Sequence, residues 1–114
     1  RQAAQMSRVV LTEHAAQDLQ AIGDYVAQDS LQASDAVIDY LIEQLAALAK
    51  TPTIGRERPD LWPGVMCFGT GKSRWRSRFM IFYRKIKGGI QVARIIEGHR
   101  HIQMALDNLP SDTN

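Results

Sequence analysis

Several features of secreted and membrane proteins are missing from this sequence. Of its 114 residues only Cys67 is a cysteine, which excludes a disulfide within the chain and the stapled frameworks of small secreted domains. No run of about 18 apolar residues is present to span a bilayer, and the N-terminus lacks the charged start and apolar stretch of a signal peptide. We therefore expect a cytoplasmic protein with no membrane partner.

Motifs that hold nucleotides or metals are missing as well. The run Gly69 to Ser73 resembles the end of a Walker A motif, but Met66 stands where that motif requires glycine, and a strand rather than a helix is predicted to follow. The three histidines, His14, His99 and His101, have neither a cysteine cluster nor the spacing of a zinc motif. We therefore expect no cofactor and no metal.

The length of the chain limits its organisation. A chain of 114 residues with 45% hydrophobic content buries one modest core and leaves little room for a deep cleft. We predict a single domain over residues 7–109, preceded by an added remnant or disordered extension at 1–6 and followed by a polar tail at 110–114. A binding role on an exposed face is favoured over an enzymatic one.

Charge is unevenly distributed, although the net charge is only +2. Residues 12–50 carry seven acidic side chains and one basic one, whereas residues 55–85 carry eight basic side chains and two acidic ones. A concentration of positive charge favours an anionic partner such as nucleic acid, phosphate or an acidic protein segment. The alternative is a solvated sheet surface.

The pattern of apolar residues predicts an α+β fold. Residues 7–11 form a strand, and Thr12 suits the N-cap of a helix over 13–28. A second helix, which follows the break at Asp29-Ser30, ends near Lys50 and forms an antiparallel hairpin with the first. A connection rich in proline and glycine spans 51–64.

The second half of the chain contains the remaining strands. They are predicted over residues 65–68, 73–84 and 90–96, and a short C-terminal helix is predicted over 100–109. The predicted fold is thus an N-terminal strand and a helical hairpin packed on a mainly antiparallel four-stranded sheet, with a short C-terminal helix.

Two groups of residues are candidates for function. Arg74, Arg76 and Arg78 alternate along a predicted strand, which places all three on one face at intervals of about 7 Å, where they suit a nucleic-acid backbone or a row of carboxylates. The alternative for these arginines is a solvated face or pairing with the acidic helices. The run His99 to His101 has the residue types for metal-independent RNA cleavage, since imidazole transfers protons and arginine stabilises phosphate charge. Helix capping or partner contact is the favoured role of this run.

Five segments resemble, in their order and spacing, the ParE toxin family of the RelE/ParE superfamily. They are residues 15–22 (AAQDLQAI), 45–52 (LAALAKTP), 55–58 (GRER), 79–84 (FMIFYR) and 92–100 (VARIIEGHR). The resemblance implies the toxin of a type II toxin-antitoxin pair, which supports plasmid stabilization by inhibiting growth. It further implies that the toxin traps the cleaved DNA complex of DNA gyrase without covalent chemistry of its own.

The resemblance also implies partners. A ParD-like antitoxin wraps the toxin through a flexible segment, and the toxin reaches operator DNA only through that antitoxin. The residues that we expect to contact the antitoxin or the target are Arg74, Arg76, Arg78, Arg84, His99 and Arg100.

Two other functions stay open at this point. A RelE-like endoribonuclease acting on messenger RNA at the ribosome would use Arg76, Arg84, His99 and His101 for catalysis. Residues 102–114 contain neither histidine nor tyrosine, residue types that RelE-like enzymes commonly carry there, so the ParE branch is favoured. A non-toxic member that only binds the antitoxin and regulates transcription is the second alternative.

Overall fold

The computed structural model describes residues 7–71 and 79–98. The chain begins with a strand, continues through two helices and returns through four strands. In order, the elements are β1 (Arg8–Leu11), α1 (Glu13–Ala27), α2 (Leu31–Lys50), a 3-10 turn (Pro52–Ile54), β2 (Arg56–Glu57), β3 (Met66–Gly69), β4 (Phe79–Ile86) and β5 (Gly89–Glu97).

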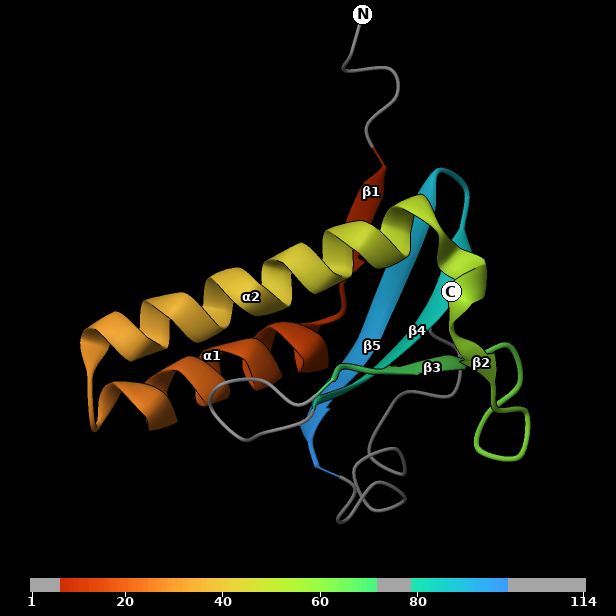
Figure 1. Cartoon of the computed structure of the whole chain (residues 1–114). Helices are drawn as coiled ribbons and strands as arrows, with labels where there is room; N and C mark the ends of the chain where they lie inside the picture. Colours follow the sequence, from red (N-terminus) through yellow and green to blue (C-terminus); the bar gives the residue numbers. More distant parts are fainter. Residues whose placement is uncertain (1–6, 72–78, 99–114) are drawn as a thin grey trace, which may run out of the picture.

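The five strands form one sheet in the order β1-β5-β4-β3-β2. Strand β1 runs parallel to β5, and all other neighbours are antiparallel. Helices α1 and α2 form an antiparallel hairpin that lies over one face of the sheet and extends beyond its edge (Figure 1). The predicted α+β fold and its helical hairpin are therefore confirmed.

The sequence prediction of four strands was one strand short. Strand β2 contains only Arg56 and Glu57, which pair with Cys67 and Met66 of β3. So short a strand, between a glycine and a loop rich in proline, leaves no alternation of apolar and polar residues to detect. Several boundaries also differ from the prediction by one or two residues. Strand β3 spans Met66–Gly69 rather than 65–68, β4 continues to Ile86 rather than 84, and β5 spans Gly89–Glu97 rather than 90–96.

Some predicted elements lie outside the described residues. These are the first part of the predicted strand 73–84, up to residue 78, and the C-terminal helix predicted over 100–109. Both stay predictions.

Hydroxyl side chains cap both helices. The Thr12 hydroxyl oxygen accepts a hydrogen bond from the Ala15 N–H at 3.1 Å, as predicted, and the hydroxyl donates to the carbonyl oxygen of Ala93 at 2.9 Å. Ser30 caps α2 in the same way by accepting from the Ala33 N–H at 3.0 Å. Each cap satisfies a backbone donor that the first turn of a helix leaves without a partner. Thr12 also ties the start of α1 to strand β5.

The main core lies between the helical hairpin and the sheet. Alternate side chains of β4, those of Phe79, Ile81 and Tyr83, face the helices and are buried. They meet the stripe of α2 that the sequence predicted, whose buried members are Val37, Leu41, Leu45 and Leu48. Full burial of such a side chain is worth about 2 kcal/mol, so this contact is the main source of the stability of the fold.

A β-bulge explains why the last strand alternates imperfectly in sequence. The register between β4 and β5 shifts so that Tyr83 faces Val92 while Phe82 faces Arg94, and Ala93 is the extra residue. As a result Val92 and Ile95, three positions apart, both face the helices, and Ala93 belongs to a smaller cluster on the other face of the sheet.

A partly buried ion pair fastens α1 to the edge of β5. The Arg94 guanidinium donates two hydrogen bonds to the Asp18 carboxylate, from Nε at 2.6 Å and from Nη2 at 2.8 Å. The same carboxylate accepts the backbone N–H of Ile95 at 2.9 Å. Because β1 pairs with β5 only as far as Val92, Asp18 takes the place of a neighbouring strand beyond that point.

A second polar anchor holds the connection after α2. The buried Tyr83 hydroxyl donates to the carbonyl oxygen of Pro52 at 2.7 Å and accepts from the Gly55 N–H at 3.1 Å. A Cβ atom at position 55 would lie 2.1 Å from this hydroxyl oxygen, so only glycine fits there. The Tyr83 side chain thereby sets the position of β2.

Candidate interaction surface

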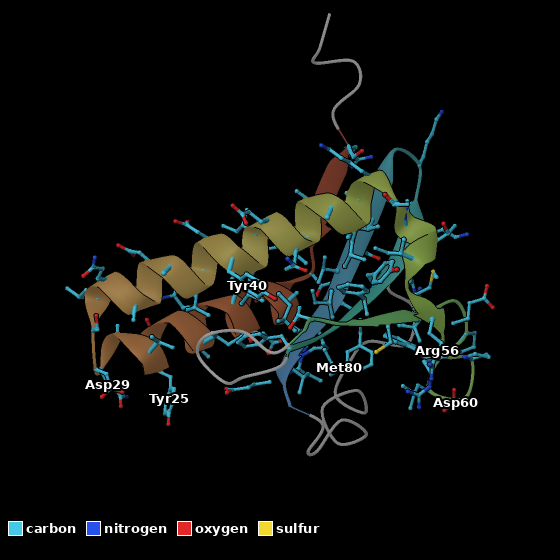
Figure 2. The ribbon with its side chains drawn as sticks, in the orientation of Figure 1. Tyr25, Asp29, Tyr40, Arg56, Asp60 and Met80 are labelled. Atoms are coloured by element: carbon cyan, nitrogen blue, oxygen red, sulfur yellow. The ribbon has the colours of Figure 1, made fainter. Side chains whose placement is uncertain are left out.

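The described residues of the two charged segments lie in different parts of the molecule. Figure 2 shows Tyr25 and Asp29 at the free end of the helical hairpin and Arg56 and Asp60 at the far side of the sheet. The acidic segment of the sequence forms the hairpin, and the described part of the basic segment forms β2, β3, β4 and the loop between β2 and β3. Among the described residues, acidic side chains therefore gather on the hairpin, and basic ones gather on β2, β4 and the loop between β2 and β3, here called the basic end. Each part suits a partner of opposite charge.

Of the residues predicted to act in binding or catalysis, only Arg84 is described by the structure. The others lie outside the described residues, and their roles stay predictions: Arg74, Arg76, Arg78, His99, Arg100 and His101.

Arg84 lies on β4, where it contacts the loop between β2 and β3. Its guanidinium carbon is 4.6 Å from the centre of the Trp62 ring, and Nη2 donates to the carbonyl oxygen of Pro63 at 3.4 Å. A cation over an indole ring contributes about 1 kcal/mol in a partly buried setting. In the described structure Arg84 thus holds this loop against the sheet.

One basic side chain of this end is already neutralised by a neighbour. Arg58 donates two hydrogen bonds to the Asp60 carboxylate, at 3.0 and 2.9 Å, and these bonds lower the pKa of the Asp60 carboxyl. The pair is solvent-exposed, so it contributes little to stability, but it removes Arg58 from the net positive field. Arg56, Lys85 and Lys87 are exposed bases of this end within the described residues.

Cys67, the only cysteine, faces the smaller cluster on the far side of the sheet. Its side chain is buried, and burial raises the pKa of the thiol more than the nearby Arg58 and Arg56 lower it. A neutral, enclosed thiol is a poor nucleophile, so this residue does not supply covalent chemistry.

We expect iodoacetamide near neutral pH to alkylate Cys67 about 100-fold more slowly in the native protein than in the unfolded one, because only local opening exposes the thiolate. Mass spectrometry of timed samples measures both rates, and equal rates would contradict the burial.

The raised pKa of the Cys67 thiol also predicts how the free energy of unfolding changes with pH. The contribution of this thiol is complete below the ordinary thiol pKa and is lost as pH rises through the higher folded-state value.

A hollow of about 260 Å³ opens at the free end of the hairpin. Both helices and the adjacent ends of β4 and β5 supply its walls: Ile22, Tyr25, Val26, Asp29, Ala33, Val37, Phe79 and Glu97. Tyr25 and Leu31, at this end of the hairpin, are 69% and 75% exposed. Sequence analysis missed this site, and its only signal was an aromatic residue outside the predicted apolar stripe of the first helix.

A second hollow, of about 190 Å³, lies at the other end between β2, β4 and the loop before β3. Its lining includes Glu57 and Lys85, and the remainder is apolar or glycine. Pockets for drug-sized ligands measure about 300 Å³ or more. Both hollows are smaller than that, which favours contact with a protein surface over capture of a small molecule.

Metal and membrane features are absent from the part of the chain that the structure describes. Within residues 7–71 and 79–98, no three histidine, cysteine, aspartate or glutamate side chains come together as a metal site. Over the same residues, neither helix combines the length and apolar character required to cross a bilayer.

Comparison with known proteins adds family information to this geometry. The family model described as "ParE toxin of type II toxin-antitoxin system, parDE" matches residues 9–102. A solved structure described as "Chromosomal ParDE TA system from P. aeruginosa" resembles this chain with a TM-score of 0.64 and 27% sequence identity. The alignment covers 83% of this chain and 99% of that one. No match was found among curated proteins.

Proposed function

Because this chain belongs to the ParE toxin family of type II toxin-antitoxin systems, we propose that it stops growth by binding DNA gyrase and trapping the complex in which gyrase has cleaved DNA. The observation that carries the proposal is the extent of the family match, which runs over residues 9–102 and so includes the hairpin, strands β2 to β5 and all but the first residue of β1. Gyrase itself supplies the DNA cleavage in this mechanism, so the toxin needs only a binding surface.

The described structure supports a binding mechanism over a catalytic one. The buried Cys67 is no nucleophile, and Arg84 is engaged with Trp62 and Pro63. A RelE-like ribonuclease would use Arg84 at the scissile phosphate, whereas in the described structure Arg84 contacts the loop between β2 and β3. The remaining ribonuclease candidates, Arg76, His99 and His101, lie outside the described residues.

The experiment that tests the proposal adds the purified protein to gyrase with supercoiled plasmid and, in parallel, to translating ribosomes. We expect linear, protein-linked plasmid DNA with intact messenger RNA, and we expect the DNA product to disappear when antitoxin is added first. Cleaved messenger RNA with intact plasmid would show that the protein acts as a RelE-like ribonuclease instead. Neither product, together with normal growth of cells that express the protein alone, would indicate a regulator that only binds antitoxin.

Membership of a ParDE system implies a ParD-like antitoxin as the partner of this chain. We propose that the antitoxin places an acidic, amphipathic segment over the basic end of the molecule, where Arg56, Lys85 and Lys87 are exposed. A flexible segment of this kind gains affinity by burying a large surface as it becomes ordered. We further propose that the pair acts in the cytoplasm and that the toxin reaches operator DNA through the antitoxin.

Reversing the charge of Arg76 is expected to weaken binding of the antitoxin or of gyrase by about 10-fold or more, on the prediction that it lies on an exposed strand face with Arg74 and Arg78. The stability of the fold should change little, since such a position carries little packing energy. Titration calorimetry of Arg76→Glu against each partner measures the effect. Arg8→Glu, which reverses an exposed base on β1 at the opposite edge of the sheet from β2, is the control. Unchanged affinity of Arg76→Glu would remove Arg76 from the contact surface.

A further inference from the structure

The hollow of about 190 Å³ at the basic end opens on the face of the sheet that packs against the helices. Glu57 pairs with Met66 and Met66 pairs with Tyr83, so these three side chains share the face of the main core. Lys85, two residues after Tyr83 on β4, lies on that face as well. None of the described residues that line the hollow belongs to α1 or α2. The hollow is therefore a part of the core face that the described helices leave open.

A type II turn shapes one wall of this hollow. The Val65 N–H donates to the carbonyl oxygen of Trp62 at 3.1 Å, Pro63 and Gly64 lie between them, and Gly64 has a φ of 81°. Proline followed by glycine is typical of this turn, because its third residue requires a positive φ. A Cβ atom on Gly64 would have no neighbour within 4 Å, so the missing side chain leaves the hollow open.

The loop that carries the turn is ordered before any partner arrives. The Arg58 N–H donates to the carbonyl oxygen of Val65 at 3.0 Å and so closes the loop at its base. On β4, Arg84 stacks on Trp62 and donates to the carbonyl oxygen of Pro63. A surface whose shape is set in advance loses little conformational entropy when a partner binds, which favours affinity.

The size and lining of the hollow suit one apolar side chain. Pro59, Val65 and Met66 are the apolar residues of its lining. An apolar cavity of about 150 Å³ binds benzene, so a hollow of about 190 Å³ has room for a branched or aromatic side chain. A partner that inserts such a side chain would complete the core face at this point.

The rim of the hollow carries two opposite charges. Glu57 on β2 and Lys85 on β4 are exposed, β3 lies between their strands, and no ion pair within the described part of the chain joins them. Arg56 and Lys87 are exposed at the same end, so an acidic segment is attracted to it. An acidic side chain pairs best with Lys85 and a hydrogen-bond donor with Glu57, so the rim also fixes the direction in which the segment lies.

We propose that this hollow is an anchor point for the antitoxin. One apolar side chain of the acidic antitoxin segment enters it, an acidic side chain beside that residue pairs with Lys85, and a donor on the other side binds Glu57. The inference rests on the proposed function, in which a ParD-like antitoxin covers the basic end. The anchor adds to the contacts that the antitoxin makes elsewhere on the sheet and the helices, and it determines the position of the segment along the toxin.

A charge swap tests the rim. The double variant Glu57→Lys with Lys85→Glu keeps the net charge of the protein and exchanges the two signs. We expect the affinity for the cognate antitoxin, measured by titration calorimetry, to fall by about 10-fold or more, as for close charge pairs at an interface. The matched control is the double variant Arg8→Glu with Glu13→Lys, which exchanges two exposed charges beside β1, at the other edge of the sheet. The control is expected to stay within about two-fold.

Filling the hollow is the second test. Asparagine adopts a positive φ more readily than most residues with a Cβ atom, so Gly64→Asn is expected to keep the turn while its side chain occupies the hollow. We expect the affinity for antitoxin to fall by about 10-fold, as for a contact at the centre of an interface. Gly98→Asn is the matched control, because Gly98 has a φ of 72° and equally open space around its Cβ position. Circular dichroism melts of all variants check that they are folded.

Four results would overturn the anchor. They are unchanged affinity in the charge swap, unchanged affinity in Gly64→Asn, an equal loss in the control of either variant, and a loss of self-association in Gly64→Asn while antitoxin affinity is kept. The last result, seen by analytical ultracentrifugation of the toxin alone, would assign the hollow to a second copy of the toxin.

A contact measurement keeps this inference distinct from the gyrase assignment. Toxin with labelled methionine methyl groups is mixed with unlabelled antitoxin, and we expect a nuclear Overhauser effect between the Met66 methyl group and an apolar side chain of the antitoxin. No such contact in the complex would refute the anchor. If the contact is present but the toxin fails to trap gyrase on cleaved DNA, the target assignment is wrong and the anchor stands. If the antitoxin does not bind the unaltered toxin at all, the partner assignment is wrong and the anchor falls with it.

Discussion

Replacing Asp18 with alanine is expected to lower the free energy of unfolding by about 3 kcal/mol. The substitution leaves the Arg94 guanidinium, 15% exposed in the ion pair, without its bidentate partner and removes the acceptor of the Ile95 N–H. Because a small part of the pair still reaches solvent, the cost falls at the lower end of the range for fully buried pairs. Urea denaturation followed by circular dichroism measures the difference.

Two companion variants make this result specific. Asp39→Ala removes an exposed acid from α2 and is expected to change stability by less than about 0.5 kcal/mol. The double variant Asp18→Ala with Arg94→Met is expected to recover part of the loss, because Met carries no charge that is costly to hold in a partly buried site. If Asp18→Ala behaves like Asp39→Ala, the ion pair does not fasten α1 to β5.

Replacing Gly89 with alanine is expected to lower the free energy of unfolding by nearly as much as Asp18→Ala does. The Cβ atom of Gly89→Ala would lie 1.9 Å from the carbonyl oxygen of Arg8 and 2.7 Å from its carbonyl carbon and its nitrogen, all backbone atoms of β1. A backbone cannot rotate away as a flexible side chain can, so β1 must move off the sheet. We expect a loss of about 3 kcal/mol, at the upper end for overpacking, since a strand contact is lost as well.

The Gly89→Ala variant also has a local signature. Hydrogen exchange should accelerate at the N–H groups of Arg8 and Thr12, which donate to Gly88 and Val92 at 2.8 and 3.0 Å. Gly71→Ala is the matched control, because a Cβ atom at that position has no neighbour within 4 Å. Slow exchange at both N–H groups in Gly89→Ala would show that β1 tolerates the methyl group.

Local chemistry explains why the sequence predicted the helices so closely. The caps at Thr12 and Ser30 and the spacing of the core residues of α2 depend on neighbours within a few positions, so they can be detected in sequence. The same holds for the turn before Gly89. Strand β2 and the bulge at Ala93 depend instead on which strand lies alongside, and neither has a local signal.

The candidate site was harder to predict for a related reason. Arg84 belongs to the basic segment, and its predicted contact with a target stays a prediction. Its contact with Trp62, which is 22 positions away in sequence, had no signal in the sequence. The pairing of Asp18 with Arg94 joins residues 76 positions apart. Charge composition correctly predicted two oppositely charged parts of the molecule. The sequence could not predict where the described residues of these two parts lie in the fold, or that the Tyr25 side chain is exposed.

The pairing of β1 with β5 has a consequence for the order in which this protein folds. The contact between Thr12 and Ala93 spans 81 positions, whereas the helical hairpin is built from neighbouring residues. Proteins whose sheets depend on such distant contacts fold slowly, because the connecting chain must close before the pairing stabilises it. During synthesis the hairpin can form early, but β1 has no partner until Gly89 and the residues after it have been made. Completion of the sheet is therefore a late event in the synthesis of each new chain, later than formation of the helical hairpin.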